Sequence, residues 1–323
     1  MEGIILFDNS MKEIGNIDID MDIEIGTVNA SNDFEIVTGE IDRYNPYGFY
    51  VDGTEYGGIF EYTKNISDSD ITTYKGYTWR GLMTKSLITP PAGSDYKVVS
   101  GEANTIIASI LSGILGDIFS VPETVSGLNI PSYQFPLYID TMNGLERMLE
   151  TYGYRLYIHA DKTAEGIKIF VEAKEAVQVS GTYNKDSDVP MTFISDQMGI
   201  NHLLCAGSGE LQERMKVDLY LDAAGNVSQT QTFFGFDERT AFYDYGSAES
   251  MDDLIQYGTE RLLELASHLS MSIDTPDNNS LEIGDVVQGT FPGGIVVRLP
   301  IVKKVYKIKN GIPSTQIKIK GDS

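Results

Sequence analysis

The chain has 323 residues, of which 47 are acidic and 24 are Lys or Arg, so its formal net charge is −23. A hydrophobic content of 41% is sufficient for real cores, and the length is typical of two or three domains. So acidic a chain is unsuited to specific nucleic-acid binding or to an anionic membrane surface, because attraction to phosphate dominates both kinds of binding.

Cysteine usage and the N-terminal sequence exclude further classes. Cys205 is the single cysteine, so neither an intrachain disulfide nor a zinc site built on cysteines can form. Residues 1–15 lack the basic and long apolar regions of a signal peptide, and no run approaches the roughly 20 apolar residues of a spanning helix. We therefore expect a soluble protein, made in a cytoplasm, without stable membrane insertion.

The N-terminal region begins with strand patterns. Residues 4–7 are expected to form a first strand, and Asp8-Asn9-Ser10 a turn. From residue 17 to residue 25 the chain alternates strictly, which predicts a strand with one apolar and one acidic face. The apolar positions are Ile17, Ile19, Met21, Ile23 and Ile25, and the acidic positions are Asp18, Asp20, Asp22 and Glu24.

The acidic face of this strand has three interpretations. Neighbouring carboxylates along it repel one another by only about 0.6 kcal/mol in water. Each buried apolar side chain stabilises by roughly 1.5–3 kcal/mol, so an ordinary solvated strand face is favoured. The alternatives are the wall of a negatively charged channel and a cation site. A straight strand lacks the tight glycine turn of a calcium loop, so the cation site ranks last.

Strand patterns continue as far as Trp79, the single tryptophan. Asp52-Gly53 predicts a hairpin turn, and residues 57–62 and 72–79 are expected to form further strands. Five to six strands in about 80 residues predict a small sandwich or barrel. We therefore assign residues 1–95 to a first β-barrel domain.

The segment from Trp79 to Pro91 is expected to lead out of this domain. Gly81 allows the backbone to bend or to approach another segment closely. Pro90 and Pro91 end regular structure, because each lacks an N–H and restricts the residue before it. We interpret the neighbouring pair Trp79-Arg80 as buried packing.

Between residues 96 and 185 the hydrophobic period becomes helical, which predicts an inserted α+β module. A second short helix is expected from Thr141 to Tyr152, ended by Gly153, and residues 154–159 and 166–173 are expected to form a strand pair. The first helix has one apolar stripe and a C-terminal glycine, formed by Ile106, Ile107, Ile110, Leu111, Ile114, Leu115 and Gly116.

Residues 186–323 are predicted to form a second β-barrel domain that contains a helix at residues 250–269. Ser250 and Asp253 are the capping pair of that helix, and Gly258 inside it costs about 1 kcal/mol unless another segment packs there. The turns are expected at residues 222–226 and at Asn310-Gly311. The expected strands are residues 191–195, 202–207, 215–221, 227–234, 271–273, 285–290, 294–299, 301–308 and 315–319.

The last predicted hairpin is locally basic although the chain is acidic. Lysines on strands most often protect an exposed edge from pairing with other chains. Contact with an acidic neighbouring subunit is the alternative. The lysines concerned are Lys303, Lys304, Lys307, Lys309, Lys318 and Lys320.

The sequence contains no motif that identifies catalytic chemistry. His159, His202 and His268 are far apart and have no carboxylate at metal-ligand spacing, and Cys205 follows an apolar run typical of a buried residue. Gly207-Ser208-Gly209 is expected to be a turn or bulge rather than an anion site. With so many acidic residues, some pair of carboxylates will resemble the catalytic pair of a glycosidase by chance. No feature of the sequence distinguishes one such pair from the others. We therefore predict no catalytic, cofactor-binding or metal-binding residues, no cofactor, and no enzymatic activity.

Several short blocks, in this order along the chain, resemble the tail hub (baseplate hub) proteins of tailed bacteriophages and related contractile injection particles. The resemblance is closest to the siphovirus Gp37-like hub family. No single block is specific, but their order over about 230 residues is. The blocks are Gly57-Gly58-Ile59, Trp79 to Leu82, Ile88 to Pro91, Asn201-His202-Leu203, Gly207 to Leu211, Asp218 to Asp222, Tyr243-Asp244-Tyr245 and Ile283 to Val287.

The resemblance implies a structural protein of the virion tail tip or baseplate, synthesised in the cytoplasm of a bacterial host. Family members form a ring of three copies around a central lumen, and each copy contributes two related β-barrel domains. The implied partners are the distal tail or tail tube protein, the tape measure protein, and a spike or tip protein. DNA would pass through the lumen without specific binding, which suits the charge of −23. The strand from Asp18 to Glu24 is our candidate for the lumen or its rim.

Two other functions stay open at this point. The first is a tail protein that binds host-surface carbohydrate, which the 19 tyrosines would suit, although they are spread through the predicted strands. The second is a cell-wall hydrolase. No lysin or protease segment follows Ser323, so an attached enzyme is not expected.

Overall fold

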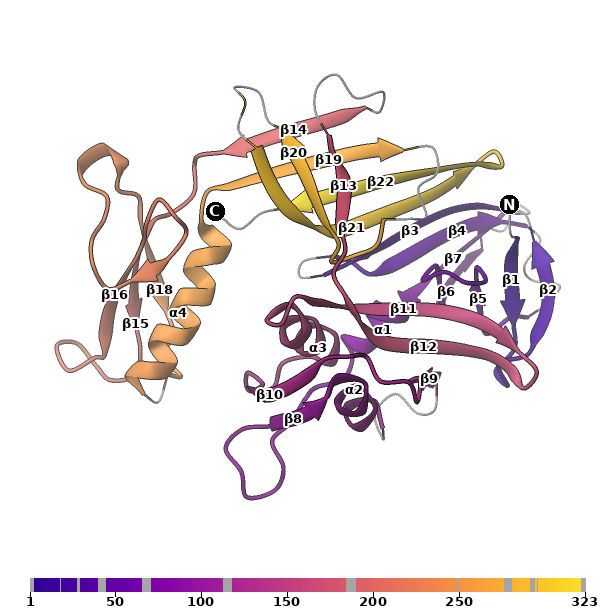
Figure 1. Cartoon of the computed structure of the whole chain (residues 1–323), viewed down its shortest axis with the longest axis horizontal. Helices are drawn as coiled ribbons and strands as arrows, with labels where there is room; N and C mark the ends of the chain where they lie inside the picture. Colours follow the sequence, from indigo (N-terminus) through magenta and orange to yellow (C-terminus); the bar gives the residue numbers. More distant parts are fainter. Residues whose placement is uncertain are drawn as a thin grey trace. The chain divides into compact units, whose positions relative to one another are not determined.

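The computed structural model describes residues 3–17, 19–27, 30–39, 45–65, 71–112, 118–183, 190–248, 250–275, 281–290, 294 and 296–320 (Figure 1). The chain folds as two compact units. The first unit comprises Met1–Pro190 and Ile273–Ile319, and the second comprises Met191–Ser272 and Lys320–Ser323. The second unit is therefore inserted into the sequence of the first, and the C-terminal strands return to the unit that contains the N-terminus.

The elements of the first unit begin with seven strands before the first helix. In chain order the first unit contains β1 (Ile4–Phe7), β2 (Glu13–Ile17), β3 (Asp20–Gly26), β4 (Asp33–Thr38), β5 (Gly48–Tyr50), β6 (Gly57–Asn65), β7 (Thr72–Thr78), α1 (Trp79–Met83), β8 (Val98–Glu102), α2 (Ala103–Leu111), β9 (Phe119–Ser120), β10 (Asn129–Gln134), α3 (Thr141–Glu150), β11 (Tyr154–Thr163), β12 (Gly166–Glu175), β13 (Gln178–Tyr183), β20 (Val286–Thr290), β21 (Val296–Lys309) and β22 (Ile312–Lys320).

The second unit is smaller, and one strand, β19, continues from it into the first unit along the chain. Its elements are β14 (Met191–Asp196), β15 (His202–Ala206), β16 (Lys216–Leu221), β17 (Val227–Ser228), the single turn η3 (Gly235–Asp237), β18 (Thr240–Asp244), α4 (Met251–Leu265) and β19 (His268–Thr275).

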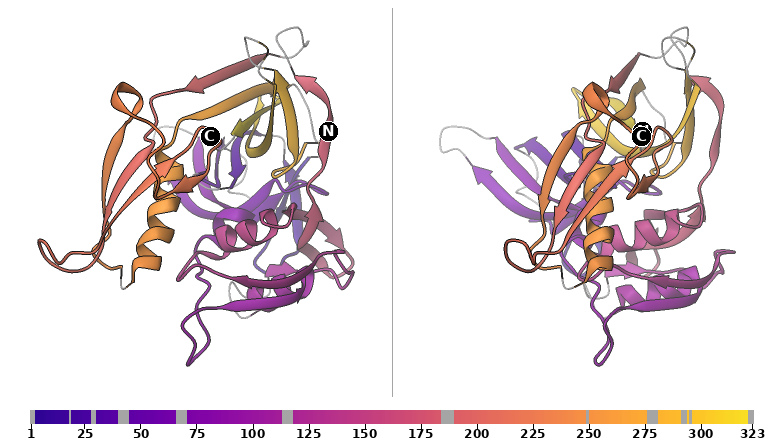
Figure 2. Two further views of the ribbon diagram at one scale, coloured as in Figure 1. Left: turned by 60° about the vertical axis from the view of Figure 1, so that its left-hand side comes forward. Right: turned by 90° about the vertical axis from the view of Figure 1, so that its left-hand side faces the viewer.

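A long antiparallel sheet forms the centre of the first unit, with the strand order β22-β21-β3-β4-β7-β6-β5-β1-β2 (Figures 1 and 2). Strand β3 follows the predicted alternation: Met21, Ile23 and Ile25 are buried, whereas Asp20 is exposed. Asp18, predicted on the same acidic face, lies outside the described residues. The predicted strand of residues 17–25 is divided between two strands, since β2 ends at Ile17 and β3 begins at Asp20.

The prediction of a β-rich α+β fold is confirmed, but the prediction of closed barrels is wrong for the described strands. At one end of the central sheet, the described part of β2 pairs with β1 and the order ends there. Strand density predicted a sandwich or barrel for the first region, and the family resemblance implied two barrels, but strand density is the same for an open, curved sheet as for a closed one. None of the helices in the described part is long and apolar enough to cross a membrane.

The strand predicted to end at Trp79 ends at Thr78, and Trp79–Met83 form the short helix α1. The Thr78 hydroxyl caps this helix by accepting a hydrogen bond from the Gly81 amide, and it donates to the carbonyl of Asn32 at 3.0 Å. A Cβ atom on Gly81 would lie 2.2 Å from that same carbonyl oxygen. The predicted close approach at Gly81 is therefore confirmed.

Helices and strands form between residues 96 and 185, and they share a core with the first strands. Trp79, Phe7 and Tyr50 belong to the same buried cluster as Leu145 of α3 and Ile169 of β12. Helix α3 begins at its cap Asp140, close to the prediction, and Gly153 follows it with φ of +75°. Helix α2 ends at Leu111, and Ile114, Leu115 and Gly116, predicted to continue and cap it, lie outside the described residues.

In the second unit, helix α4 covers one face of a sheet with the order β17-β16-β15-β18 (Figure 2). Ser250 and Asp253 form the predicted capping box. A Cβ on Gly258 would lie 2.6 Å from Cys205 Sγ, so glycine is required where the helix meets β15. The helix ends at Leu265 rather than 269, because the chain from His268 onward forms β19.

Two other predicted boundaries differ from the structure. The strand expected at residues 227–234 is confined to Val227–Ser228. The strands expected at residues 294–299 and 301–308 are one strand, β21. Pro300 lies where β21 changes its partner from β20 to β22, a position at which a missing N–H is tolerated. The predicted Asn310-Gly311 turn is confirmed, with positive φ at both residues.

Candidate functional site

Charged side chains form a row across four neighbouring strands of the central sheet. Lys307 of β21 lies opposite Asp22 of β3, Asp22 lies opposite Glu35 of β4, and Glu35 lies opposite Lys75 of β7. Lys307 forms an ion pair with Asp22, and Lys75 forms one with Glu35. The two central carboxylates repel one another, and the lysine on each side compensates for this repulsion.

The same face continues beside this row. Lys303 Nζ lies 2.7 Å from Glu24 Oε1, and the Asp20 carboxylate accepts a hydrogen bond from the Asn310 amide at 2.7 Å. Burial acts to raise the pKa of Glu24, but hydrogen bonds from Lys303 and Ser31 outweigh it, so this pKa is lowered. The acidic strand and the basic hairpin, recognised separately in the sequence, are therefore neighbours, and their face is a mosaic of both signs.

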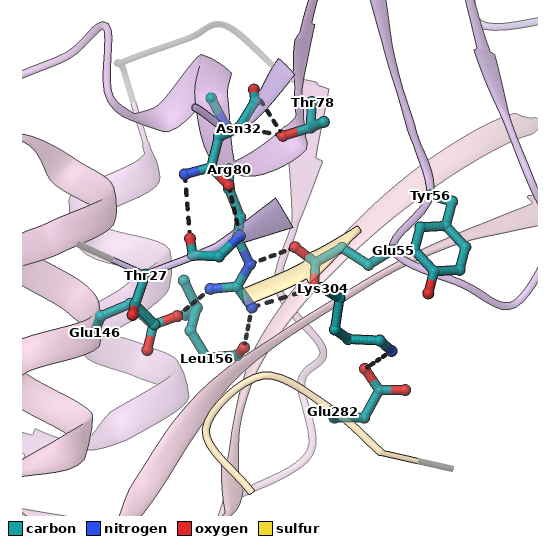
Figure 3. A network of polar contacts seen from close by, with 12 residues as sticks. Thr27, Asn32, Glu55, Tyr56, Thr78, Arg80, Glu146, Leu156, Glu282 and Lys304 are labelled. Carbon is teal, nitrogen blue, oxygen red and sulfur yellow. Dashed lines mark hydrogen bonds and ion pairs between the residues drawn. The ribbon is translucent and has the colours of Figure 1, made fainter. Parts of the chain in front are cut away.

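A buried ionic network surrounds Arg80, whose side chain is 1% exposed (Figure 3). Its Nε and Nη2 atoms donate to the two carboxylate oxygens of Glu55, and its Nη1 donates to Glu146. Nη2 also donates to the carbonyl of Leu156 at 2.9 Å. Arg80 on α1 thus connects the β5–β6 turn, helix α3 and strand β11.

The charges in this network are unequal, because one guanidinium faces two carboxylates. Burial raises the pKa of Glu55, and the positive charge of Arg80 only partly opposes this effect. Burial acts to lower the pKa of Arg80, but the charges of Glu55 and Glu146 outweigh burial and raise this pKa, so Arg80 stays charged. Removing one partner of such a buried pair typically costs about 3–5 kcal/mol, since a buried charge is left uncompensated.

A second buried pair connects the module to the C-terminal strands. Arg155 Nε of β11 lies 2.8 Å from Asp285 Oδ1. The Asp285 carboxylate also accepts hydrogen bonds from the amides of Val177 at 3.0 Å and Glu282 at 3.1 Å. Gly284, with φ of +89°, lies against Arg155, where a Cβ would be 2.6 Å from the Arg155 Cβ. The chain entering β20 is therefore fixed to β11.

A polar cavity of about 320 Å³ opens beside Glu55. Its tyrosine rings are engaged within the chain: Tyr56 stacks on Tyr306 with centroids 4.4 Å apart, and the Lys174 ammonium lies 3.5 Å from the centroid of Tyr157. Sugar stacking needs an accessible ring face, so this cavity gives the carbohydrate interpretation no support. The lining residues are Asp52, Gly53, Thr54, Glu55, Tyr56, Tyr157, Glu282 and Lys304.

Two of the histidines contact carboxylates within their own unit. His159 lies 3.3 Å from Asp161 in the first unit, whereas His202 contacts Asp218 and Glu238 in the second. Among the described residues no group of three His, Cys, Asp or Glu side chains could hold a metal ion. Sequence reasoning missed the partners of His202, because Asp218 and Glu238 are too far from it along the chain for any local pattern to indicate a contact.

The remaining candidates have structural explanations. Cys205 is buried, and burial together with the charge of Asp218 raises the pKa of its thiol to about 11. Gly207-Ser208-Gly209 forms the predicted turn, with φ of +104° at Gly209. Trp79 is fully buried and stacks on Phe7, as expected of packing. The network around its neighbour Arg80 was missed, because its partners are 25 and 66 residues away.

Comparison with known proteins finds similar structures but no similar sequences. No family model matches the sequence, and no curated protein matches it. A tail protein from Neisseria meningitidis is similar in structure, with 13% identity, a TM-score of 0.54, and coverage of 99% of this chain and 96% of that one. A prophage MuSo2 tail protein from Shewanella oneidensis is similar with 11% identity, a TM-score of 0.54, and coverage of 98% of both chains. This chain thus has the fold of phage tail proteins over its whole length, and the resemblance found in the sequence is confirmed at the level of the fold.

Proposed function

We propose that this protein is a structural, non-enzymatic component of a phage or phage-like tail. The observation that carries the proposal is that the likeness to two tail proteins extends over both units rather than over one shared module. The buried ion pairs of Arg80 and Arg155 support it, because they join segments that are far apart in the sequence, as expected of a structural component. The rings of Tyr56 and Tyr157 are already occupied, so the carbohydrate alternative gains nothing from the cavity.

The finer proposal is a tail hub at the distal end of the tail, in which three copies surround a lumen. The hub would join the tail tube or distal tail protein, with the tape measure protein, to a spike or tip protein. The order of the sequence blocks supports this assignment, and so does the charge of −23, since a DNA conduit must not hold its cargo. The division into residues 1–95, 96–185 and 186–323 belongs to the same proposal.

The face of β3 remains our candidate for the lumen or its rim, in a modified form. Asp22 and Glu24 pair with Lys307 and Lys303 of the same chain, so the wall would be a mosaic rather than purely acidic. Reversing the charges of Asp20, Asp22 and Glu24 should then alter DNA ejection. Unchanged ejection from particles that carry the substitutions would count against this location.

Antibody-gold labelling of particles from the source culture tests the assignment. We expect label at the distal end of the tail, or at that end after mild disruption exposes a buried epitope. Label on side fibres would instead indicate a receptor-binding protein. Absence of the protein from disrupted particles would overturn the tail assignment. Native mass spectrometry of the purified protein or of released tail tips tests the trimer separately.

A further inference from the structure

His202 of β15 is held between carboxylates on both sides of its ring. Nε2 lies 2.8 Å from Asp218 Oδ1, and Nδ1 lies 2.8 Å from Glu238 Oε1. The ring also stacks on Tyr220, its partner across the strand pair, with centroids 4.3 Å apart. Thr240, its partner on β18, places its hydroxyl 3.0 Å from Nδ1. These are the groups that face the ring from β16, from β18 and from the chain before β18.

The contacts of the ring differ between its charged and neutral forms. A neutral imidazole has one N–H and one lone pair, whereas the imidazolium has two N–H groups. Only the imidazolium carries the positive charge that attracts Asp218 and Glu238 at the same time. Burial and the charges of Asp218 and Glu238 raise the pKa of the neighbouring Tyr220, which agrees with a locally negative setting.

Glu238 belongs to a loop that exposes aromatic side chains. The aromatic loop, residues 229–239, contains Phe234, which is 66% exposed, and Phe236, which is fully exposed. Its C-terminal end is held at β15 by four hydrogen bonds. The Asn201 and His202 amides donate to the Arg239 carbonyl, Asn201 Nδ2 donates to the Asp237 carbonyl at 2.7 Å, and the Arg239 amide donates to Asn201 Oδ1 at 2.8 Å.

Each protonation state of the ring has its own partner at Nδ1. In the imidazolium, the positive charge of the ring forms an ion pair with Glu238, whose Oε1 lies 2.8 Å from Nδ1. In the neutral ring with its proton on Nε2, Nδ1 accepts from the Thr240 hydroxyl, and its lone pair faces the Glu238 carboxylate. The repulsion between that lone pair and the carboxylate then disfavours the present position of Glu238. Two partners for one atom make the contact bistable.

We propose that His202 is a proton-controlled clamp: the imidazolium fixes the aromatic loop on β15, and loss of its proton to solvent releases Glu238 and loosens the loop that presents Phe234 and Phe236. The Asn201 hydrogen bonds do not involve this proton, so they can still form after its loss, but without the contact to Glu238 they open more often and the base of the loop loosens without unfolding. The inference concerns the second unit alone and does not depend on the proposed function.

Two measurements on the full-length chain test the clamp. Ring nitrogen NMR follows the protonation of His202, which is feasible because the chain has three histidines. Hydrogen exchange at the amides of Asn201, His202 and Arg239, corrected for the intrinsic effect of pH, follows the base of the loop. We expect their protection to fall roughly tenfold to a hundredfold with the same midpoint as the ring, the range for loss of a hydrogen bond to a charged group.

Three variants separate the clamp from general effects of pH. In Glu238→Gln the His202 ring should still gain and lose its proton beside Asp218. The protection of the loop amides from hydrogen exchange should then no longer change with the protonation of the ring. His202→Asn should remove the pH dependence of the loop altogether. His159→Asn, at the histidine of the first unit, is the matched control and should change nothing in the loop. Protection of the Cys205 thiol from modification verifies that the second unit remains folded in each variant.

Either of two results would overturn the proposal. One is corrected loop protection that stays constant while the His202 ring loses its proton. The other is a Glu238→Gln protein whose loop follows the ring as in the natural protein.

Discussion

The interior of the first unit and the interior of the second are stabilised by different kinds of contact. In the first, buried arginines join segments from distant parts of the chain, as Arg80 does for the β5–β6 turn, α3 and β11. In the second, helix α4 packs on its sheet through apolar contacts, and Gly258 lies against Cys205. The ion pair of Arg214 with Asp244 there includes a carboxylate that is 58% exposed.

Because of this difference, the positions most sensitive to substitution are of a different kind in each unit. A buried charged joint requires its partner, because an uncompensated charge in a core is costly. An apolar helix–sheet contact responds instead to volume, so a single added methyl is the appropriate perturbation. The chain supplies a probe for each unit, since its one tryptophan, Trp79, lies in the first and its one cysteine, Cys205, in the second.

The strongest test of this comparison is Arg80→Met. The substitution leaves the carboxyl groups of Glu55 and Glu146 buried without their cation, and we expect the first unit to lose roughly 3–5 kcal/mol of unfolding free energy. Urea unfolding followed by Trp79 fluorescence measures it. Lys75→Met, at an exposed pair of the same unit, is the control and should cost no more than about 1 kcal/mol. Equal effects of the two substitutions would remove the distinction between buried and exposed pairs.

The second unit is tested by Gly258→Ala. Alanine favours a helix by about 1 kcal/mol, but its Cβ would lie 2.6 Å from Cys205 Sγ. We expect overpacking to prevail, with a net destabilisation of roughly 1–2 kcal/mol. Urea unfolding followed by circular dichroism measures it, and adding Cys205→Ala should restore most of the loss. A stabilised Gly258→Ala protein would show that the contact yields easily.

A change of pH is expected to have a smaller effect on the stability of the first unit, through the contact between β3 and β21. The folded state lowers the pKa of Glu24, so its contribution to stability is present above the unfolded pKa and is lost as pH falls through the folded value. The stability of the first unit should therefore decline on acidification below the ordinary range of glutamate. Glu24→Gln should make that decline shallower, as judged by Trp79 fluorescence across a pH series. An unchanged slope would assign the acid sensitivity to other carboxyls.

The smallest effect is expected at the exposed end of the charged row. Lys307→Met removes the partner of Asp22, and both side chains are about half exposed. Surface pairs of this kind contribute about 0–1 kcal/mol. Thermal unfolding at low and at high salt measures the change, and the difference between natural and substituted protein should shrink as salt increases. A loss comparable with that of Arg80→Met would mean that the row acts as a cooperative network.

Local sequence patterns correctly predicted the faces and the caps of the elements. The alternation of β3, the capping box of Ser250 and Asp253, and the Asn310-Gly311 turn each depend on residues within a few positions. Pairing partners could not be found in this way, because periodicity shows which face a residue occupies but not what lies opposite. Asp22 and Lys307 are 285 residues apart. For the same reason the open sheet and the network of Arg80 could not be predicted.

The pairing of β3 with β21 also determines the order of events during synthesis. Strand β3 leaves the ribosome early and must wait for β21, whereas residues 191–272 form a contiguous unit that can fold first. We expect nascent chains that end before residue 296 to protect the second unit from protease while β3 remains cleavable. During this wait β3 has an unpaired edge, the feature that promotes aggregation between chains. Asp20, Asp22 and Glu24 supply the like charges that keep such an edge from joining its copies on neighbouring ribosomes.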